Sequence, residues 1–208
     1  MIIADKTSQV ANIALSENAM ESHQVAGGSL VISTIGNPKK NDDMLRYLQT
    51  LYGAQEVQEL GLYARTEQVP NPDSRVSLST DKRDALGMPL ASLHWALTEQ
   101  DWKTIHTLGV SFANAASANE NGIVKLAKWV REFDNWPRSL WYGSHHMGTT
   151  RMHQDIRQGV VDGDCKLHGL SNLYIAGSSV FTTSGWANPT YTLVALAFRL
   201  AAKLQAMA

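Results

Sequence analysis

Residues 171–205 read SNLYIAGSSVFTTSGWANPTYTLVALAFRLAAKLQ. The apolar run NLYIA (172–176) predicts a short β-strand, and the glycine and serines at 177–179 predict the turn that follows it. A long stretch of apolar, helix-forming residues then completes a strand–loop–helix unit. Such a unit brings the turn close to a helix N-terminus, where unpaired N–H groups and the helix dipole favour electron-rich oxygens.

The start of this helix is marked by Asn188 and Pro189, which are favoured at the N-cap and the first helical position. From the residues alone, Asn188 has two interpretations. It caps the helix, which would contribute ~0.5–2 kcal/mol, or it hydrogen-bonds to a substrate hydroxyl. The inner face of the helix is predicted to consist of Leu193, Ala197, Leu200 and Leu204.

Three extended segments earlier in the chain predict an antiparallel sheet with one covered face. They are residues 62–69, 75–79 and 89–98. Between the first two, Pro72 and Asp73 suit the centre of a type I turn. Because strands and helices lie in separate parts of the sequence, the predicted fold class is α+β.

Two helices are predicted after these strands. Thr98 and Asp101 can form a capping box at the start of the first helix. Its buried stripe is predicted to contain Trp102, Ile105, Leu108, Gly109 and Phe112. The second helix is predicted over 123–133. Before the strands, Gly and Asn-Pro punctuation predicts a loop over 27–41, and apolar spacing predicts a helix that ends at Gly53.

Composition narrows the class of protein. Of 208 residues, 44% are hydrophobic and 18% are charged, so a packed core is expected. The net charge of −1 supplies no basic field for nucleic acid, and no apolar run reaches the roughly 20 residues that cross a bilayer. Cys165 is the only cysteine, which excludes an internal disulfide. The single cysteine favours a cytoplasmic location. A targeting signal would lie at the true N-terminus, which this sequence need not include, so the location is left undecided.

Two adjacent histidines stand in the sequence GSHHMGTTRM, residues 143–152. His145 could take a proton from an alcohol as hydride leaves the adjacent carbon, because imidazole titrates near neutrality. A structural histidine bonded to a neighbouring carbonyl is the commoner outcome for such a residue. A shared metal is disfavoured, since adjacent side chains on an extended chain point to opposite faces. No zinc-binding spacing such as H-E-x-x-H occurs, so we expect no metal site.

Other polar residues have ordinary structural interpretations. Ser178 and Ser179 lack the G-x-S-x-G context of a hydrolase nucleophile. Arg151 is expected to pair with an acid such as Asp155 or Asp162. Trp186 is more often a core residue or a pocket wall than a reagent.

Several ordered motifs together resemble the C-terminal part of the glucose–methanol–choline (GMC) oxidoreductases. They are SHHMGTTRM, VVDGDCKLHGLSNLYIAGSSVF and TSGWANPTYTLVALAFRLA, preceded by RTEQVPNPDSRVSLS and DALGMPLASLHWALTEQD. The similarity runs from about Tyr63 to the end of the chain. It implies an FAD-dependent enzyme that oxidises the CH–OH group of a small alcohol, sugar or polyol.

The resemblance also implies roles for individual residues. The family's catalytic histidine precedes the glycine of a Gly-Thr pair by three positions, which is His145 here, with His146 as its neighbour. The second active-site residue, a histidine or asparagine, matches Asn188. We expect these two side chains to face one hollow beside the helix tip. The positions that approach the flavin match Gly177, Ser178, Asn188, Pro189 and Thr190.

One departure from the family pattern is informative. No G-x-G-x-x-G turn, which binds the ADP half of FAD, occurs in these 208 residues. We therefore expect a fragment of a larger enzyme, which binds FAD incompletely and is inactive alone unless a missing region or subunit is supplied. Apolar surface should be exposed around 172–176 and 190–204.

The expected organisation has three parts. Residues 1–61 form a lead-in of loops and helix, 62–142 a substrate-binding antiparallel sheet with helices, and 143–208 the histidine segment with the last strand and helix of an incomplete FAD domain. The alternative is a non-enzymatic remnant or partner-binding domain that keeps the fold without flavin.

Overall fold

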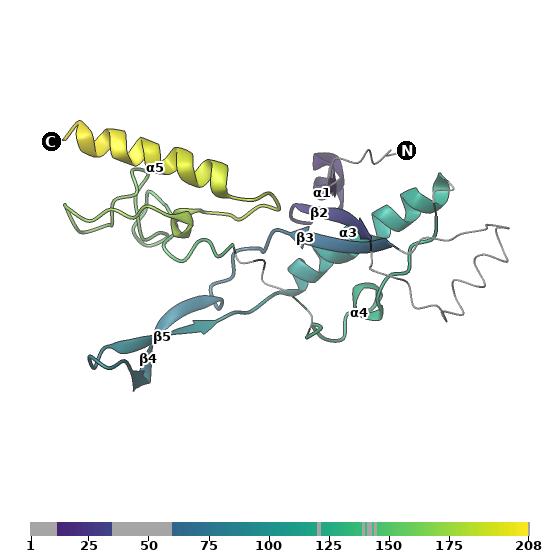
Figure 1. The fold of residues 1–208 in the computed structure, drawn as a ribbon, viewed down its shortest axis with the longest axis horizontal. Coiled ribbons are helices and arrows are strands. Elements are labelled where there is room, and N and C mark those ends of the chain that lie inside the picture. Colours follow the sequence, from purple (N-terminus) through teal and green to yellow (C-terminus); the bar gives the residue numbers. More distant parts are fainter. Residues whose placement is uncertain are drawn as a thin grey trace.

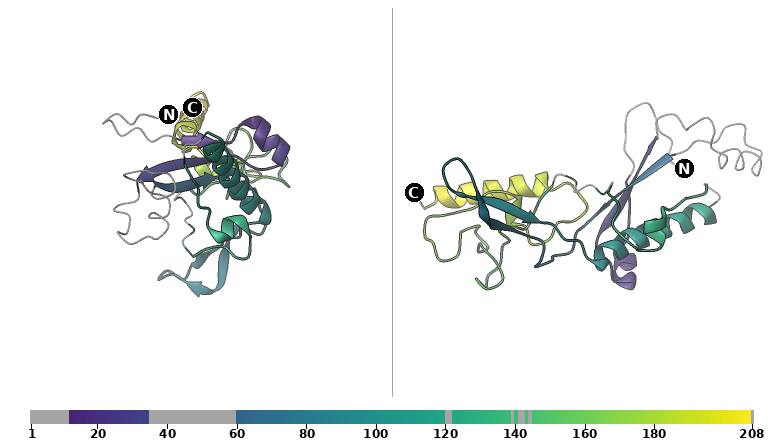
Figure 2. Two further views of the ribbon diagram at one scale, coloured as in Figure 1. Left: turned by 90° about the vertical axis from the view of Figure 1, so that its right-hand side faces the viewer. Right: turned by 90° about the horizontal axis from the view of Figure 1, so that it is seen from below.

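The computed structural model describes residues 12–34, 60–119, 122–138, 140, 143 and 145–207. The molecule is elongated, with a sheet-and-helix region at one end and the C-terminal region at the other (Figure 1; Figure 2). Antiparallel sheets are combined with separate helices, so the predicted α+β class is confirmed. The predicted helix ending at Gly53 lies outside the described residues.

A three-stranded antiparallel sheet forms the first region. Strands β1 (Asn12–Ala14), β2 (Gly28–Thr34) and β3 (Leu60–Thr66) are ordered β1-β2-β3, and helix α1 (Glu17–His23) connects the first two. The prediction of a loop over 27–41 is therefore wrong for 28–34. β2 is the central strand, its backbone is paired on both sides, and Leu30 and Val31 are buried, so its apolar residues outweigh the loop signal of the glycines.

Helix α3 (Glu99–Ala118) packs against this sheet (Figure 1). The predicted capping box is confirmed, with both the Thr98 and the Asp101 side chains bonded to backbone N–H groups. Asp101 is buried and also accepts a hydrogen bond of 2.8 Å from the Val69 N–H, which ties the helix start to the segment after β3. Leu108 and Gly109 of the predicted stripe are buried, whereas its other three members are half-buried.

The central strand β2 contains one unusual polar group. Ser29 is fully buried, and within the described part of the chain its hydroxyl has no hydrogen-bond partner. Burying such a group costs free energy. We therefore expect Ser29→Ala to leave the free energy of unfolding unchanged or raise it by up to ~1 kcal/mol in urea denaturation.

Thr104 provides the matched control, because it is equally buried but fully bonded. Its hydroxyl accepts from the Ala26 N–H and donates to the Gln100 carbonyl, both at 3.2 Å. Thr104→Val should lower the free energy of unfolding by roughly 1–3 kcal/mol. A comparable loss in Ser29→Ala would show that the Ser29 hydroxyl is bonded after all.

Strands β4 (Arg75–Arg83) and β5 (Pro89–His94) form a separate two-stranded hairpin, not one sheet with β3 as predicted. The predicted turn is confirmed, with the Ser74 N–H bonded to the Asn71 carbonyl at 3.0 Å. The predicted covered face is wrong for this chain: Val76, Leu78 and Leu93 are 49%, 69% and 62% exposed. β3 is already paired with β2, and no described element packs on the hairpin, which extends away from the molecule (Figure 1).

Helix α4 (Lys128–Arg131) is much shorter than the helix predicted over 123–133. Its N-cap residue Ala127 is extended, with ψ of 150°, and provides no side-chain cap. Gly122 has φ of +143°, so the chain before α4 is irregular. The α4 segment is instead held by α3, since the Trp102 indole donates to the Trp129 carbonyl at 2.8 Å.

The C-terminal region contains a short 3₁₀ helix, η1 (Ser178–Val180), and the long helix α5 (Thr190–Gln205). Its core consists of Val161, Cys165, Val180 and Leu200. The strand predicted over 172–176 is wrong. Only Tyr174 forms an isolated bridge, to Lys166, because the described residues offer no neighbouring strand.

The inner face of α5 also differs from the prediction. Leu200 is buried and Leu196 packs against the same core, whereas Ala197 and Leu204 are exposed. The loops beneath α5 meet the side of the helix that carries Leu196, so the buried stripe is rotated away from Ala197. On the other side, Tyr191, Val194 and Phe198 are 89%, 43% and 73% exposed, which confirms the predicted exposure of apolar surface over 190–204.

Polar contacts fix the far end of α5. The Arg199 guanidinium donates to the Gly163 carbonyl at 2.6 Å, and the Lys203 ammonium donates to the Asp164 carboxylate. The hydrogen bond from Lys203 lowers the pKa of Asp164 below its usual 3.8, and the same bond raises the pKa of Lys203 above its usual 10.5.

This pair predicts a pH dependence of stability. Because the folded-state pKa of Asp164 is lowered, its contribution is present above about pH 3.8 and is lost as the pH falls through the folded value. Asp164→Asn should therefore lower the free energy of unfolding slightly at neutral pH and low salt, and the difference from the parent chain should vanish in acid. The effect is small because the two side chains are 39% and 51% exposed. Urea denaturation across pH measures it, and a difference that persists in acid would contradict the ion pair as its cause.

Candidate active site

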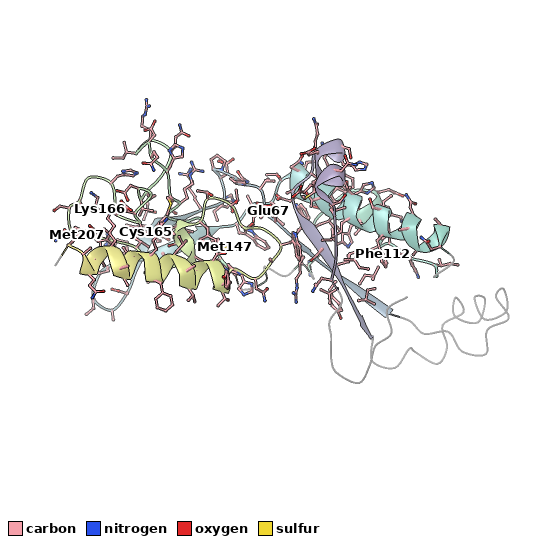
Figure 3. The ribbon with its side chains drawn as sticks, turned by 90° about the horizontal axis from the view of Figure 1, so that it is seen from above. Glu67, Phe112, Met147, Cys165, Lys166 and Met207 are labelled. Atoms are coloured by element: carbon pink, nitrogen blue, oxygen red, sulfur yellow. The ribbon has the colours of Figure 1, made fainter. Side chains whose placement is uncertain are left out.

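A cavity of about 420 Å³ lies where the two regions of the molecule meet. Its walls come from α1, the segment before β2, the residue after β3, and the loop that leads into α5. Figure 3 shows Glu67 at this junction. The polar or aromatic residues of the lining are Glu67, Phe181, Ser184, Trp186, Asn188 and Thr192.

The loop before α5 is held against the sheet region by two contacts. The Ser184 hydroxyl accepts a hydrogen bond of 3.3 Å from the Gln68 N–H. Trp186 packs on Gly27 so closely that a Cβ at Gly27 would lie 3.0 Å from the indole Cδ1. Gly185 has φ of +81°, a left-handed conformation that glycine adopts without strain and that turns Trp186 toward the cavity. The interpretation of Trp186 as a pocket wall is thus confirmed.

Asn188 does not cap α5 as predicted. The helix begins at Thr190, the residue before it is Pro189, and no side-chain cap hydrogen bond is formed. Pro189 is already helical, with φ of −80° and ψ of −6°, and its carbonyl accepts the Leu193 N–H at 2.9 Å. Within the described residues the Asn188 amide has no hydrogen-bond partner, so it is available on the cavity wall.

The segment that carries the histidines runs alongside η1. Hydrogen bonds join the Thr150 N–H to the Ser179 carbonyl and the Met152 N–H to the Val180 carbonyl, each at 2.9 Å. The Ser178 hydroxyl donates to the His146 carbonyl at 2.9 Å. The structure therefore brings the predicted flavin-contact residues Gly177 and Ser178 next to the two histidines.

His145 itself is exposed and is not among the residues that line the cavity. Its segment nevertheless adjoins that cavity: a Cβ at Gly148 would lie 3.4 Å from the carbonyl oxygen of Phe181, and Phe181 is part of the lining. The convergence of the His145 and Asn188 side chains on one hollow stays a prediction.

The other histidines of this region have structural partners. The His153 Nδ1 accepts from the Asp155 N–H at 2.9 Å, and the His168 Nε2 lies 2.9 Å from the His153 carbonyl. In the part of the chain that the structure describes, no group of three or more His, Cys, Asp or Glu side chains could hold a metal ion.

The predicted acid partner of Arg151 is wrong. The Arg151 Nε donates to the Gln158 carbonyl at 2.6 Å, and Asp155 instead pairs with Arg157 at 2.6 Å. The tight turn over 155–159 explains why the partners differ from the prediction. It places the Arg157 guanidinium next to Asp155, and it directs the Gln158 carbonyl toward Arg151. The hydrogen bond from Arg157 lowers the pKa of the Asp155 carboxyl.

The glycine–serine turn and the histidine segment lie side by side, and they adjoin the cavity at the start of α5 through Phe181. Residues 70–197 match the family described as GMC oxidoreductase. Since this match covers more than half of the 208 residues, the chain belongs to the GMC oxidoreductase family.

Curated relatives agree with this assignment. The chain is 30% identical over 186 residues to the fructose dehydrogenase large subunit of Gluconobacter japonicus, covering 88% of this chain and 30% of that protein. It is 35% identical over 129 residues to the C-glycoside 3-oxidase of Microbacterium trichothecenolyticum, covering 60% and 23%. It is 29% identical over 133 residues to the 2-methyl-1,2-propanediol dehydrogenase of Mycolicibacterium austroafricanum, covering 64% and 23%. The chain thus matches only 23% to 30% of the length of these relatives.

None of the helices in the described ranges is both long enough and apolar enough to cross a bilayer.

Proposed function

We propose that this chain is the substrate-side part of an FAD-dependent oxidoreductase that acts on the CH–OH group of a small alcohol, sugar or polyol. The observation that carries the proposal is the unbonded Asn188 amide on the wall of a cavity at the start of α5. An asparagine that capped α5 would have its side-chain oxygen bonded to a backbone N–H of the first turn, and that oxygen would not be available to a ligand. Family membership supports the reaction class, because the relatives are named as dehydrogenases or oxidases of sugars and a diol.

The residues at the start of α5 fit the electron-rich edge of a flavin ring. α5 is 16 residues long and has no acidic residue in its first turn, so the partial positive charge of its N-terminus is not neutralised locally. A Cβ at Gly177 would meet nothing within 4 Å, so the backbone there is open to a flat group. The residues that would hold the flavin are Gly177, Ser178, Asn188, Pro189 and Thr190. When bound, FAD supplies a hydride acceptor.

Two side chains of this chain serve the reaction in the proposal. His145 receives the hydroxyl proton on an imidazole nitrogen, which the exposed position of the ring leaves accessible. Asn188 donates a hydrogen bond to the substrate oxygen and fixes its orientation. The Ser178 hydroxyl holds the histidine segment in place through the His146 carbonyl.

Flavin binding is proposed to require a region that this chain does not contain. The sequence has no G-x-G-x-x-G turn, and the chain matches less than a third of its relatives' length. The exposed apolar side of α5, with Tyr191, Val194 and Phe198, provides a surface for such a region. The incomplete FAD domain is thus part of the proposal.

Complementation tests the proposal. The chain is co-expressed with a polypeptide that carries the family's glycine-rich region, and the purified complex is assayed for flavin absorbance and for oxidation of sugars and diols with an artificial electron acceptor. We expect flavin and activity in the complex and neither in the isolated chain. A complex that forms without taking up flavin would instead favour the alternative, a non-enzymatic partner-binding domain.

A further inference from the structure

A carboxylate without a partner lies on the wall of the cavity. Glu67 follows β3 directly, and its backbone N–H donates to the Gly27 carbonyl at 2.8 Å, which fixes the position of the residue. The side chain is half-buried and lines the cavity. Within the described part of the chain its carboxylate accepts no hydrogen bond and forms no ion pair.

An unpaired donor lies close to this acceptor. A Cβ at Gly27 would be 3.5 Å from the Glu67 Oε2 and 3.7 Å from the Trp186 Nε1, so both atoms flank the same glycine. The Trp186 indole N–H has no partner among the described residues, and the same holds for the Asn188 amide. An acceptor, a donor and an amide with both functions therefore border one cavity, together with the aromatic ring of Phe181.

This set of groups favours a particular kind of ligand. A few placed polar groups in a partly apolar cavity fix the orientation of a ligand and set its specificity. Adjacent hydroxyls of a polyol can donate to the carboxylate and accept from the indole, while the C–H faces of the ligand contact the aromatic rings. A monohydric alcohol would leave the carboxylate unpaired, and an anionic ligand would be repelled by it.

We infer that Glu67 is a specificity-determining residue, which accepts hydroxyl hydrogens of a neutral polyol and excludes anionic analogues. This inference rests on the proposed function, because it names the class of substrate for the same site. Glu67 takes no proton from the reacting hydroxyl, a role that the proposed function gives to His145.

The test measures ligand binding to the isolated 208-residue chain, without flavin or turnover. The chain is labelled with ¹⁵N-tryptophan, and the indole resonance of Trp186 is identified from its loss in Trp186→Phe. D-glucose, D-glucuronate and isopropanol are then titrated. D-glucose and D-glucuronate have the same ring. D-glucose carries a CH₂OH group where D-glucuronate carries a carboxylate, so the two ligands differ in charge. We expect D-glucose to shift the Trp186 resonance and D-glucuronate and isopropanol to bind at least about 10-fold more weakly.

Glu67→Gln keeps the size of the side chain and removes its charge. It should weaken D-glucose binding about 10-fold or more and abolish the discrimination against D-glucuronate. Glu132→Gln is the matched control, because it removes the same charge from an exposed residue that is not part of the cavity lining, and should change neither affinity.

Two results would overturn the inference: a Trp186 resonance that does not respond to D-glucose, or a response that Glu67→Gln leaves unchanged. Either could occur while the complemented enzyme still takes up flavin and oxidises an alcohol through His145. The opposite result is also informative. If the chain bound sugar in a Glu67-dependent way but never formed a flavin complex, the proposed oxidation would be contradicted, and the cavity would be a sugar-binding site only.

Discussion

Replacement of His145 by alanine is expected to lower kcat of the flavin-loaded, complemented enzyme about 10²–10⁴-fold. The reason is that the substrate oxygen must lose its proton as hydride leaves the adjacent carbon, and a solvent molecule is a poor substitute for a positioned imidazole. Flavin content and KM should change little, because His145 is exposed and its segment is held by backbone hydrogen bonds to η1, which the substitution does not remove.

His146→Ala is the matched control for this prediction. The neighbouring residue has the same side chain and is also exposed, and the hydrogen bond from Ser178 goes to its backbone carbonyl, which alanine keeps. We therefore expect a much smaller loss of kcat in His146→Ala than in His145→Ala. The rate of flavin reduction in a single turnover, measured across pH, should rise with pH in His145→Ala because hydroxide replaces the missing base. Equal losses in the two variants would contradict the assignment of His145 as the base.

Local signals in the sequence predicted local structure well. The Thr98–Asp101 capping box and the turn closed by Ser74 and Asn71 involve residues at most three positions apart, so their geometry depends little on the rest of the chain. Strand pairing was predicted less well. β3 pairs with β2, about thirty residues earlier, and the turn signal after β3 suggested the nearer β4 instead. Nothing in a period-two pattern specifies which strand will be the neighbour.

The candidate site was predicted unevenly for a similar reason. His145 and Asn188 stand out only through the family resemblance, whereas Glu67 lies in the polar sequence RTEQVPNPDS and has no spacing that marks it. Its position becomes visible when Trp186, far away in sequence, is seen to flank the same glycine. The capping interpretation of Asn188 was wrong because Pro189 and Thr190 form the first turn without its side chain.

The second large effect concerns the two sides of α5. Leu200 is 7% exposed and packs in the core with Val161, Cys165 and Val180. Leu200→Ala leaves a cavity there and should lower the free energy of unfolding of the isolated chain by about 2–5 kcal/mol. Phe198 lies on the same helix but is 73% exposed, so Phe198→Ala should change that free energy by no more than about 0.5 kcal/mol. Urea denaturation followed by tryptophan fluorescence measures both changes.

Phe198→Ala, which should hardly affect the stability of the isolated chain, is expected to have a large effect on assembly with the flavin-binding region. Phe198 lies in an exposed apolar strip of α5 together with Val194 and Ala197. A large aromatic side chain that becomes fully buried in an interface typically contributes about 2 kcal/mol or more to binding. Phe198→Ala should therefore weaken complex formation at least about 10-fold, measured by titration calorimetry, while the isolated chain keeps its stability. Because the remaining apolar residues Tyr191 and Val194 lie on the same side, complex formation should be weakened without being abolished. If Phe198→Ala bound the flavin-binding region as tightly as the parent chain, the exposed side of α5 could not be the surface that the missing region covers.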